Sequence, residues 1–444
     1  MKTLTTLIAA ACLVGAALAQ QPNPPAKTGP EHQKLALWFG EWTYVGESQT
    51  TFFGPGGKLT GRLTGRPILD GFGGEYVFVE NGPSGETSQT NSPEIIRFKP
   101  TRDQYYYLFG GGKPVLKVNP GNRMLLWTED AANGRIKTYE DISSSLPQTD
   151  GSNPQTGPFY VNGAAPGDTL ALKIVDIQPA ESQAWSCFGP RFGFLFSNDF
   201  DPVLNATVPE MVWLYPVNKE TWTVTFVPRN MPGYKVEIPM HPFMGTIGTA
   251  PDGGECHDSM TAKWSGGNMD CVETKAGSTV YLPVNVAGAM WSIGDCHLVQ
   301  GDGEACGSAV ECRSWVTVEI LPLIKGKKVR TPRIENDEYL ISCGNARPLD
   351  SAYKIAYEDM INWLVDDYGF HWMDAYQLMS QVSPVRVGNV VDPNFTVVVK
   401  FPKKYLPKRD RPLPKADSFK RKTGLLGALY SVGFSEGKDP EFDC

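Results

Sequence analysis

Residues 294–304, GDCHLVQGDGE, bring three acids, a histidine and a glutamine together among three glycines in one short run. The side chains with chemical potential in this stretch are Asp295, His297, Gln300, Asp302 and Glu304. If residues 295 and 297 share a strand, both point to one face, because successive side chains alternate across a strand. An imidazole nitrogen and carboxylate oxygens on one face suit zinc or another divalent cation. A metal site is one interpretation of the stretch, and a turn rich in Asp and Gly is the other.

Other parts of the chain add potential ligands to this stretch. The segment SGGNMD ends in Asp270, and the segment EIPMHPFMG carries His241, one of only five histidines. Calcium is a rival ion, but the EF-hand pattern D-x-[DN]-x-[DN]-G is absent, so only an irregular calcium site would fit.

Motifs of other enzyme classes are missing or incomplete. Neither G-x-x-x-x-G-K-[ST] nor H-E-x-x-H occurs. A G-x-S-x-G match at residues 433–437 would require a histidine further along the chain, yet the last histidine is His371. We attribute that match to chance. The net charge of −7 argues against a nucleic-acid partner, which would favour a basic surface.

The first residues predict export. Lys2 precedes an apolar run that ends in Ala-Leu-Ala before Gln20, which is typical of a signal peptide over residues 1–19. We therefore expect a secreted or periplasmic protein, with a Pro-rich linker over residues 20–30. No later segment approaches the ~20 apolar residues that a spanning helix needs. Eight of the nine cysteines would remain after cleavage, and an even number suits oxidation, although spacing does not give the pairing.

A small β unit is expected over residues 31–111, where glycine turns separate alternating strands. Its E-H-x-x-L and G-x-W patterns resemble a small lipocalin-like domain of unknown function, and fall on Glu31, His32, Leu35, Gly40 and Trp42. The unit is too short to close a full barrel, so we expect a partial one.

Residues 112–406 predict a larger, mainly β (α+β) domain. Two strand, Pro-Gly turn, strand patterns at residues 114–130 and 157–177 are interpreted as hairpins of a sandwich. Further strands are expected in TWTVTFVP, GSTVYLPVNV and WVTVEIL. Helical spacing over residues 351–382 predicts a pair of helices, the first ending at Gly369. Residues 407–444 are basic and Pro-rich, which indicates an extended tail.

Several ordered motifs of the larger domain resemble the acetamidase/formamidase family. They are GPFYVNGAAPGDTLALKI, HPFMGTIGTAP, SGGNMD, the segment from GSTVYLPVNV through GDCHLVQGDGE to GSAVE, and the helices DMINWLVDDYG and DAYQLMS. The resemblance spans about residues 114–406. It implies hydrolysis of short amides such as formamide and acetamide to carboxylate and ammonia. It further implies a sandwich or jelly-roll-like fold with a helical pair, a divalent metal and an oligomer, expected here as a homodimer.

The resemblance also implies roles for individual residues. The expected metal ligands are Asp270, Asp295 and His297, completed by His241 or Asp130, with zinc as the expected ion. Glu304 is expected to take a proton from water and give it to the leaving amine. Gln300 and Asp302 are expected to orient ligands or substrate.

Two alternatives remain open at the level of sequence. Cys296 or Cys306, both close to His297, could act as a nucleophile, although Cys296 alternates with the acid and histidine and should face the other way. Cys296 also stands where the family usually has a small or neutral residue. The chain could instead be an exported metal- or ligand-binding protein on an amidase-like fold, since fold alone does not guarantee activity.

Overall fold

The computed structural model describes most of the chain between residues 95 and 407. Nearer the N-terminus it describes only the backbone of four strands, and within the main part it leaves out residues 147–150, 190–191, 196–208 and 232. The predicted signal peptide, the linker and the tail from residue 408 lie outside the described residues.

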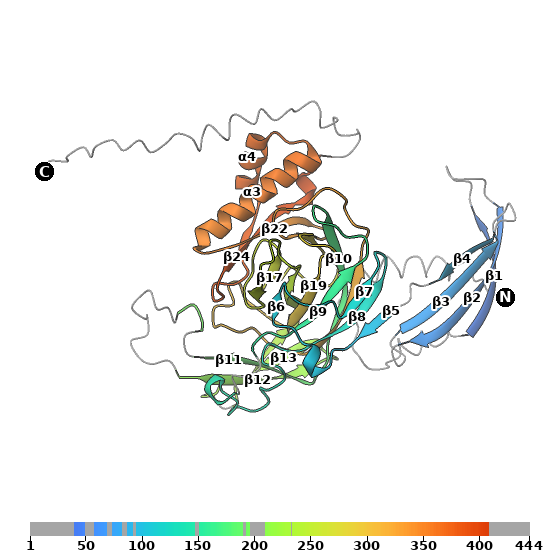
Figure 1. Cartoon of the computed structure of the whole chain (residues 1–444). Coiled ribbons are helices and arrows are strands. Elements are labelled where there is room, and N and C mark those ends of the chain that lie inside the picture. Colours follow the sequence, from blue (N-terminus) through green and yellow to red (C-terminus); the bar gives the residue numbers. More distant parts are fainter. Residues whose placement is uncertain are drawn as a thin grey trace, which may run out of the picture.

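Two sheets form the centre of the molecule (Figure 1). The nine-stranded sheet has the order β23 (Val385–Val387), β24 (Phe395–Pro402), β22 (Tyr339–Ala346), β21 (Arg333–Glu335), β18 (Thr279–Pro283), β10 (Thr169–Pro179), β20 (Ser314–Ile320), β8 (Arg123–Thr128), β5 (Ile95–Phe98). The five-stranded sheet has the order β17 (Gly266–Asn268), β15 (Phe243–Gly248), β19 (Trp291–His297), β9 (Gln155–Val161), β7 (Leu116–Val118).

One hydrophobic core joins these two sheets. Strand β20 alternates cleanly, with Val316, Val318 and Ile320 buried and the residues between them partly exposed. These side chains belong to the same apolar cluster as Met244 of β15 and Trp291 of β19. Burial of apolar surface between two sheets is the main stabilising term of a sandwich. The prediction of a mainly β sandwich is confirmed.

Smaller sheets lie around this sandwich. One is antiparallel: β11 (Gln183–Phe188), β12 (Met211–Asn218), β13 (Thr223–Phe226), β14 (Val236–Pro239). Strand β16 (His257–Asp258) pairs with β6 (Leu108–Phe109). Short 3-10 helices are η2 (Arg102–Gln104), η3 (Ser143–Ser145) and η4 (Lys403–Tyr405).

The four strands nearest the N-terminus form an antiparallel sheet of their own: β1 (Gly40–Ser48), β2 (Gly57–Ile68), β3 (Gly73–Asn81), β4 (Thr87–Asn91). Strands β5 and β6, which the sequence grouped with this unit, pair instead with β8 and β16 of the larger domain. The resemblance of the N-terminal unit to a lipocalin-like domain stays a prediction.

The two predicted hairpins are wrong, although the strands themselves exist. Strand β7 pairs in parallel with β9, whereas β8 pairs with β20 and β5. In the same way β9 pairs with β19, whereas β10 pairs with β18 and β20. Each Pro-Gly turn therefore carries the chain from one sheet to the other. A turn motif only reverses the direction of the chain. Strands β8 and β9 are buried at nearly all of their residues, so packing in the core determines which strands they pair with.

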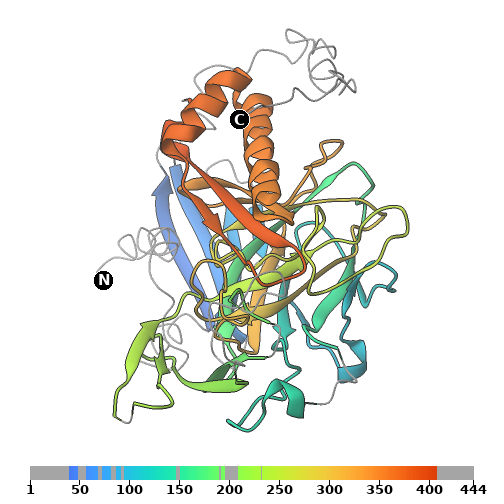
Figure 2. The ribbon, with the colours of Figure 1, turned by 90° about the vertical axis from the view of Figure 1, so that its left-hand side faces the viewer.

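The predicted helical pair is confirmed. Helix α3 (Leu349–Tyr368) ends at Gly369, whose φ of +73° is the left-handed conformation that glycine adopts without steric cost. Helix α4 (Trp372–Val382) follows at once. Both helices cover the β22 and β24 end of the large sheet (Figure 2), through a second apolar cluster that includes Met360 and Phe401.

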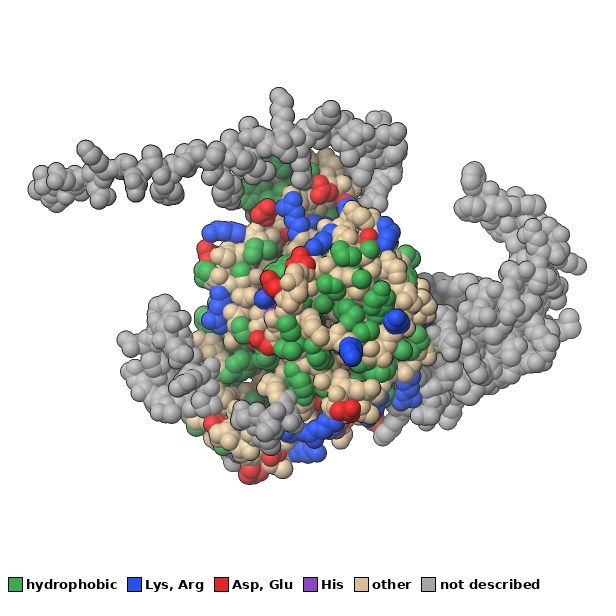
Figure 3. Space-filling model, viewed as in Figure 1, with side chains coloured by type: hydrophobic (Ala, Val, Ile, Leu, Met, Phe, Trp, Pro, Cys, Tyr) green, Lys and Arg blue, Asp and Glu red, His purple; other side chains and the backbone are tan. Residues whose placement is uncertain are grey.

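The surface charge, the helices and the cysteines relate to three further predictions, on nucleic-acid binding, membrane spans and oxidation. Charged side chains of both signs are interspersed over the face that Figure 3 shows, with no field of one sign. Within the described residues, no helix is long and apolar enough to cross a membrane. The seven cysteines in the described part of the chain are all free thiols.

Candidate active site

Six ionisable side chains converge at one end of a cavity beside β19. They are Asp270, Asp295, His297, Glu304, Glu311 and Asp392, and each is between 0% and 7% exposed. His297 is shared by two groups of three whose ligand atoms lie within 4.8 Å of one another, one with Asp270 and Glu304 and one with Asp295 and Glu311. Asp295 and His297 of β19 lie together, as the sequence predicts, with 3.3 Å between Asp295 Oδ1 and His297 Nε2.

A glycine makes room for this cluster. Gly245 lies on β15, the neighbour of β19. A Cβ atom at this position would stand 2.7 Å from Asp270 Oδ1, 2.9 Å from Asp295 Oδ2 and 3.0 Å from His297 Cε1. The H-P-x-x-G motif thus ends in a residue without a side chain because three polar side chains occupy that space.

Gln300 determines which nitrogen of His297 faces the acids. The Gln300 amide nitrogen donates to the carbonyl oxygens of Asp270, at 2.9 Å, and Gly388, at 3.0 Å. Its carbonyl oxygen must then accept from His297 Nδ1, 2.9 Å away. Nε2 is left facing Asp295 Oδ1 at 3.3 Å and Glu311 Oε1 at 3.2 Å. A neutral imidazole has no proton there, so a proton or a cation must lie between these three atoms.

Several carboxylate oxygens of the cluster are buried without a hydrogen-bond donor from the described residues. They are both oxygens of Asp270, Oδ1 of Asp295 and Oε2 of Glu311. A buried charge without compensation is costly, so these atoms call for a positive partner. The set of one imidazole nitrogen and several carboxylate oxygens fits a divalent metal ion.

Burial dominates the electrostatics of the acids. It raises the pKa of Asp270, Glu304 and Asp392 well above the ordinary range, and the charges of neighbouring carboxylates add to the effect. Burial also raises the pKa of Glu311, to about 7. Burial alone would lower the pKa of His297, but the carboxylates of Glu311 and Asp295 together outweigh it and raise that pKa well above its usual value.

Left-handed backbone concentrates at this site. Asn153, Asp270, Asp295 and Glu304 have φ values between 47° and 62°, and they are four of the eight described non-glycine residues with positive φ. Such a conformation costs on the order of 1–3 kcal/mol per residue and persists where the surrounding structure imposes it. The side chains are held in place by the strands and turns around them at a cost to local stability.

The other predicted site residues lie elsewhere. The His241 side chain is exposed at the surface, outside the cluster. Asp302 is exposed and forms an ion pair with Arg386 at 2.6 Å. Asp130 is buried, but its Oδ1 accepts from the backbone amides of Ala132 and Gly134, at 2.9 Å each, and so stabilises a turn.

Two members of the cluster were missed at the level of sequence. Glu311 ends the GSAVE motif, and its backbone bridges to His297, which places the two side chains side by side. Asp392 lies in a loop, where its Oδ2 accepts from Asn268 Nδ2 at 2.7 Å. Glu311 could have been predicted from the sequence, because it is an acid at the end of the GSAVE motif. No local pattern distinguished Asp392.

The two candidate nucleophilic cysteines do not fit that role. Cys296 belongs to the hydrophobic core, on the side of β19 away from the acids, and burial raises the pKa of its thiol to about 12. Cys306 is exposed, and its pKa is also raised by desolvation. A nucleophilic cysteine needs a lowered pKa to supply the thiolate.

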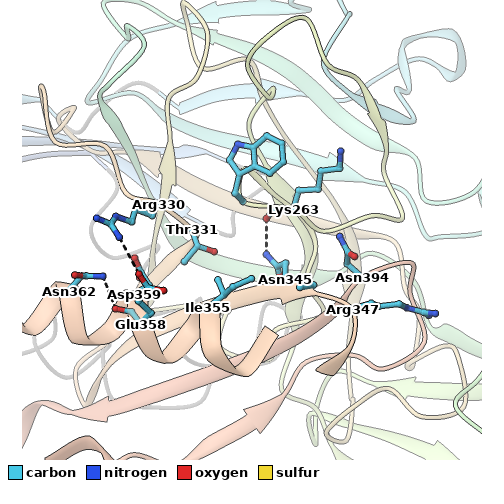
Figure 4. Close-up of a pocket in the computed structure, with 12 residues that line it drawn as sticks. Lys263, Arg330, Thr331, Asn345, Arg347, Ile355, Glu358, Asp359, Asn362 and Asn394 are labelled. Carbon is cyan, nitrogen blue, oxygen red and sulfur yellow. Dashed lines mark hydrogen bonds and ion pairs between the residues drawn. The ribbon is translucent and has the colours of Figure 1, made fainter. Parts of the chain in front are cut away.

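The cluster opens into a cavity of about 390 Å³. Asn153, Asn268, Asp295, His297, Glu304, Glu311 and Asp392 line it from the polar side. A second cavity of about 430 Å³ lies along α3 and holds none of the six clustered residues (Figure 4). Its wall includes Arg347, which donates to the backbone oxygen of Asp392 at 2.7 Å and so supports the acidic cluster from behind.

Known proteins resemble this chain in sequence and in structure. The acetamidase of Yersinia enterocolitica is 38% identical, with a TM-score of 0.66 over 71% of this chain and 94% of that one. The acetamidase of Bacillus halodurans is 28% identical, with a TM-score of 0.62 over 70% and 98%. The formamidase of Methylophilus methylotrophus is 25% identical over 248 residues, which are 46% of this chain and 60% of its own. The chain spans about three-fifths of the length of the curated relatives that it matches.

The sequence model described as the acetamidase/formamidase family matches residues 112–262 and 253–406. Together these segments are well over half of the chain and include every member of the acidic cluster. The chain belongs to the acetamidase/formamidase family.

Proposed function

We propose that this protein hydrolyses the C–N bond of primary amides to a carboxylate and ammonia, with a divalent cation, zinc first, in the acidic cluster. The observation that carries the proposal is the buried convergence of His297 with five acids at a cavity, in a chain of this family. The formamidase and acetamidases that resemble the chain support the reaction class.

His297 Nε2, Asp295 and Glu311 would hold the ion, and Asp270 would supply further carboxylate oxygens. When bound, a divalent cation lowers the pKa of water to roughly 7 and stabilises negative charge on the reacting carbonyl oxygen. An imidazole nitrogen favours zinc or another transition metal over calcium, which prefers six to eight oxygens.

Glu304 would move the proton. As the water oxygen attacks the carbonyl carbon, Glu304 accepts a proton from it, and as the C–N bond breaks, Glu304 gives that proton to the nitrogen, which leaves as ammonia. Burial raises the pKa of Glu304, which suits a group that must both accept and donate near neutral pH. Gln300 would keep the His297 ring oriented through Nδ1.

Ammonia release from formamide, acetamide and longer primary amides tests this proposal, together with metal analysis of the purified protein. We expect about one ion per chain and turnover that a chelator abolishes and zinc restores. Bound metal without turnover on any amide would favour a non-catalytic binding protein instead. Turnover that survives complete removal of metal would contradict the metal-assisted route.

We also propose that the mature protein is exported and forms a homodimer. The support for export is the pattern of residues 1–20, and the support for the dimer is the family resemblance. N-terminal sequencing of protein from the periplasm or the medium should begin at Gln20. Light scattering should give twice the mass of the mature chain. An intact Met1 terminus would contradict export, and the mass of a single chain would contradict the homodimer.

A further inference from the structure

We propose that the natural substrate carries an apolar alkyl or aryl group of about four to eight carbons, instead of the hydrogen of formamide or the methyl of acetamide. This inference rests on the proposed amidase function and specifies its substrate class. It is carried by the shape and chemistry of the cavity beside the acidic cluster.

Apolar side chains also line the cavity beside the acids. The side chains there are Ala131, Ile136, Leu146, Trp185, Phe192 and Met260. Ala132, Ile136 and Trp185 are only 5% to 8% exposed and form a hydrophobic cluster of their own with Val212. These buried side chains therefore form a packed wall and not a scatter of surface residues.

The backbone aligns this wall with the acids. Trp185 and Glu311 exchange two backbone hydrogen bonds, of 3.2 Å and 2.7 Å, and Glu311 bridges in turn to His297. Residues directly opposite each other in an antiparallel pair project to the same side, with Cα atoms about 5.5 Å apart. The Trp185 indole thus lies next to the Glu311 carboxylate, so an amide held at the acids would extend its acyl group along the indole.

The charge at the wall favours an uncharged acyl group. Arg135 is the one Lys or Arg side chain among the described residues that line the cavity. It donates to the backbone oxygens of Ala132, at 2.8 Å, and Gly151, at 3.1 Å. Its guanidinium is thus engaged in holding the wall, and a carboxylate on the substrate would have to compete for it.

The volume is far larger than a small amide needs. About 390 Å³ falls within the range of roughly 300–1,000 Å³ of pockets that bury drug-sized ligands. A water molecule occupies about 30 Å³, so formamide or acetamide would leave several waters against an apolar wall. An apolar chain displaces those waters and gains the free energy of burial.

The first test measures kcat/KM for formamide, acetamide, butyramide, hexanamide and phenylacetamide by ammonia release from the metal-loaded protein. We expect kcat/KM to rise about three- to fourfold for each methylene until the cavity is full, the ratio that corresponds to about 0.8 kcal/mol. Values that stay level or fall from acetamide to hexanamide would overturn the inference.

A matched pair of variants tests the position of the chain. Ala131→Leu adds carbon inside the cavity and should lower the ratio of kcat/KM for hexanamide over acetamide by about tenfold. Ala165→Leu makes the same change on an exposed turn outside the cavity and should leave the ratio unchanged. An unaltered ratio in Ala131→Leu would contradict this placement of the acyl group.

Binding of inert analogues separates this inference from the proposed reaction. Methyl ketones have the shape of primary amides but cannot be hydrolysed. Calorimetry should give a Kd for pentyl methyl ketone at least about tenfold below that for acetone. If no amide is hydrolysed but this preference holds, the amidase proposal fails and the apolar pocket stands. Equal binding of the two ketones overturns the pocket, whatever the activity.

Discussion

The absence of one carbon atom at Gly245 allows the acidic cluster to form. Three of its members approach the place that a Cβ atom would occupy to within 3.0 Å. Two of these neighbours are carboxylate oxygens held by residues with left-handed backbone, Asp270 and Asp295, so they have little freedom to move aside. Composition alone does not distinguish Gly245 from the other glycines of the chain.

Gly245→Ala should therefore remove the bound metal with the fold retained. We expect a loss of metal affinity of at least about tenfold, because the displaced ligands leave their productive geometry. Gly301→Ala is the matched control, since a Cβ there meets nothing within 4 Å. Metal analysis after dialysis, with circular dichroism for the fold, measures both. Full metal content in Gly245→Ala would show that the ion does not use these three side chains.

Glu304 and Asp302 are two acids in one motif with different surroundings. Glu304→Gln should lower kcat by at least about 100-fold while metal content stays near one, because a neutral amide cannot accept the proton. Asp302→Asn removes only an exposed ion pair with Arg386 and should leave kcat within about twofold. Loss of metal in Glu304→Gln would instead identify Glu304 as a ligand.

The loop between β23 and β24 is the element that brings Asp392 to the site. Its ends are tied by the Gly388 amide, which donates to the Thr396 oxygen at 2.8 Å. Arg347 supports the loop from the second cavity, donating to the Asp392 oxygen and stacking 4.3 Å from the centre of the Phe395 ring. The loop is therefore a positioned part of the site.

Arg347→Ala should lower kcat/KM by about tenfold with little change in the melting temperature, because a small displacement of a site residue is costly to the rate. Arg330→Ala is the control. Arg330 lines the same cavity but pairs with Glu358 on α3 (Figure 4) and should leave activity unchanged. Kinetics and thermal unfolding of the two variants decide the matter. Equal effects of the two substitutions would assign Arg347 a general structural role only.

At the scale of the whole molecule, the acidic cluster couples stability to pH. The pKa of Glu311 is about 7 in the folded chain against roughly 4.3 in an unfolded one. Between these values the folded, metal-free chain keeps a proton that the unfolded chain releases, so its free energy of unfolding falls as pH rises. The raised pKa of His297 acts in the same direction from about pH 6.5 upwards.

A metal ion bound in the cluster would replace those protons, and its affinity would therefore rise with pH. We expect the gain in free energy of unfolding from zinc to be clearly larger at pH 8 than at pH 5. Urea unfolding of metal-loaded and chelator-treated protein at the two pH values measures this gain. An equal gain at both pH values would mean that the ion does not displace protons from the cluster.

Local periodicity was sufficient for a large share of these features. The spacing along one strand predicted that Asp295 and His297 lie together and that Cys296 faces the other way, as observed. Helical spacing and a glycine predicted α3 and its end. These features depend on neighbours in the chain, whose geometry is set by backbone sterics.

Tertiary structure alone decided which distant groups meet. It brought Glu311 and Asp392 into the cluster and left His241 and Asp302 at the surface. It also sent the two Pro-Gly turns across the sandwich. The physical reason is that side-chain direction follows from the local backbone, whereas the distance between segments follows from strand pairing and burial, which the whole core determines.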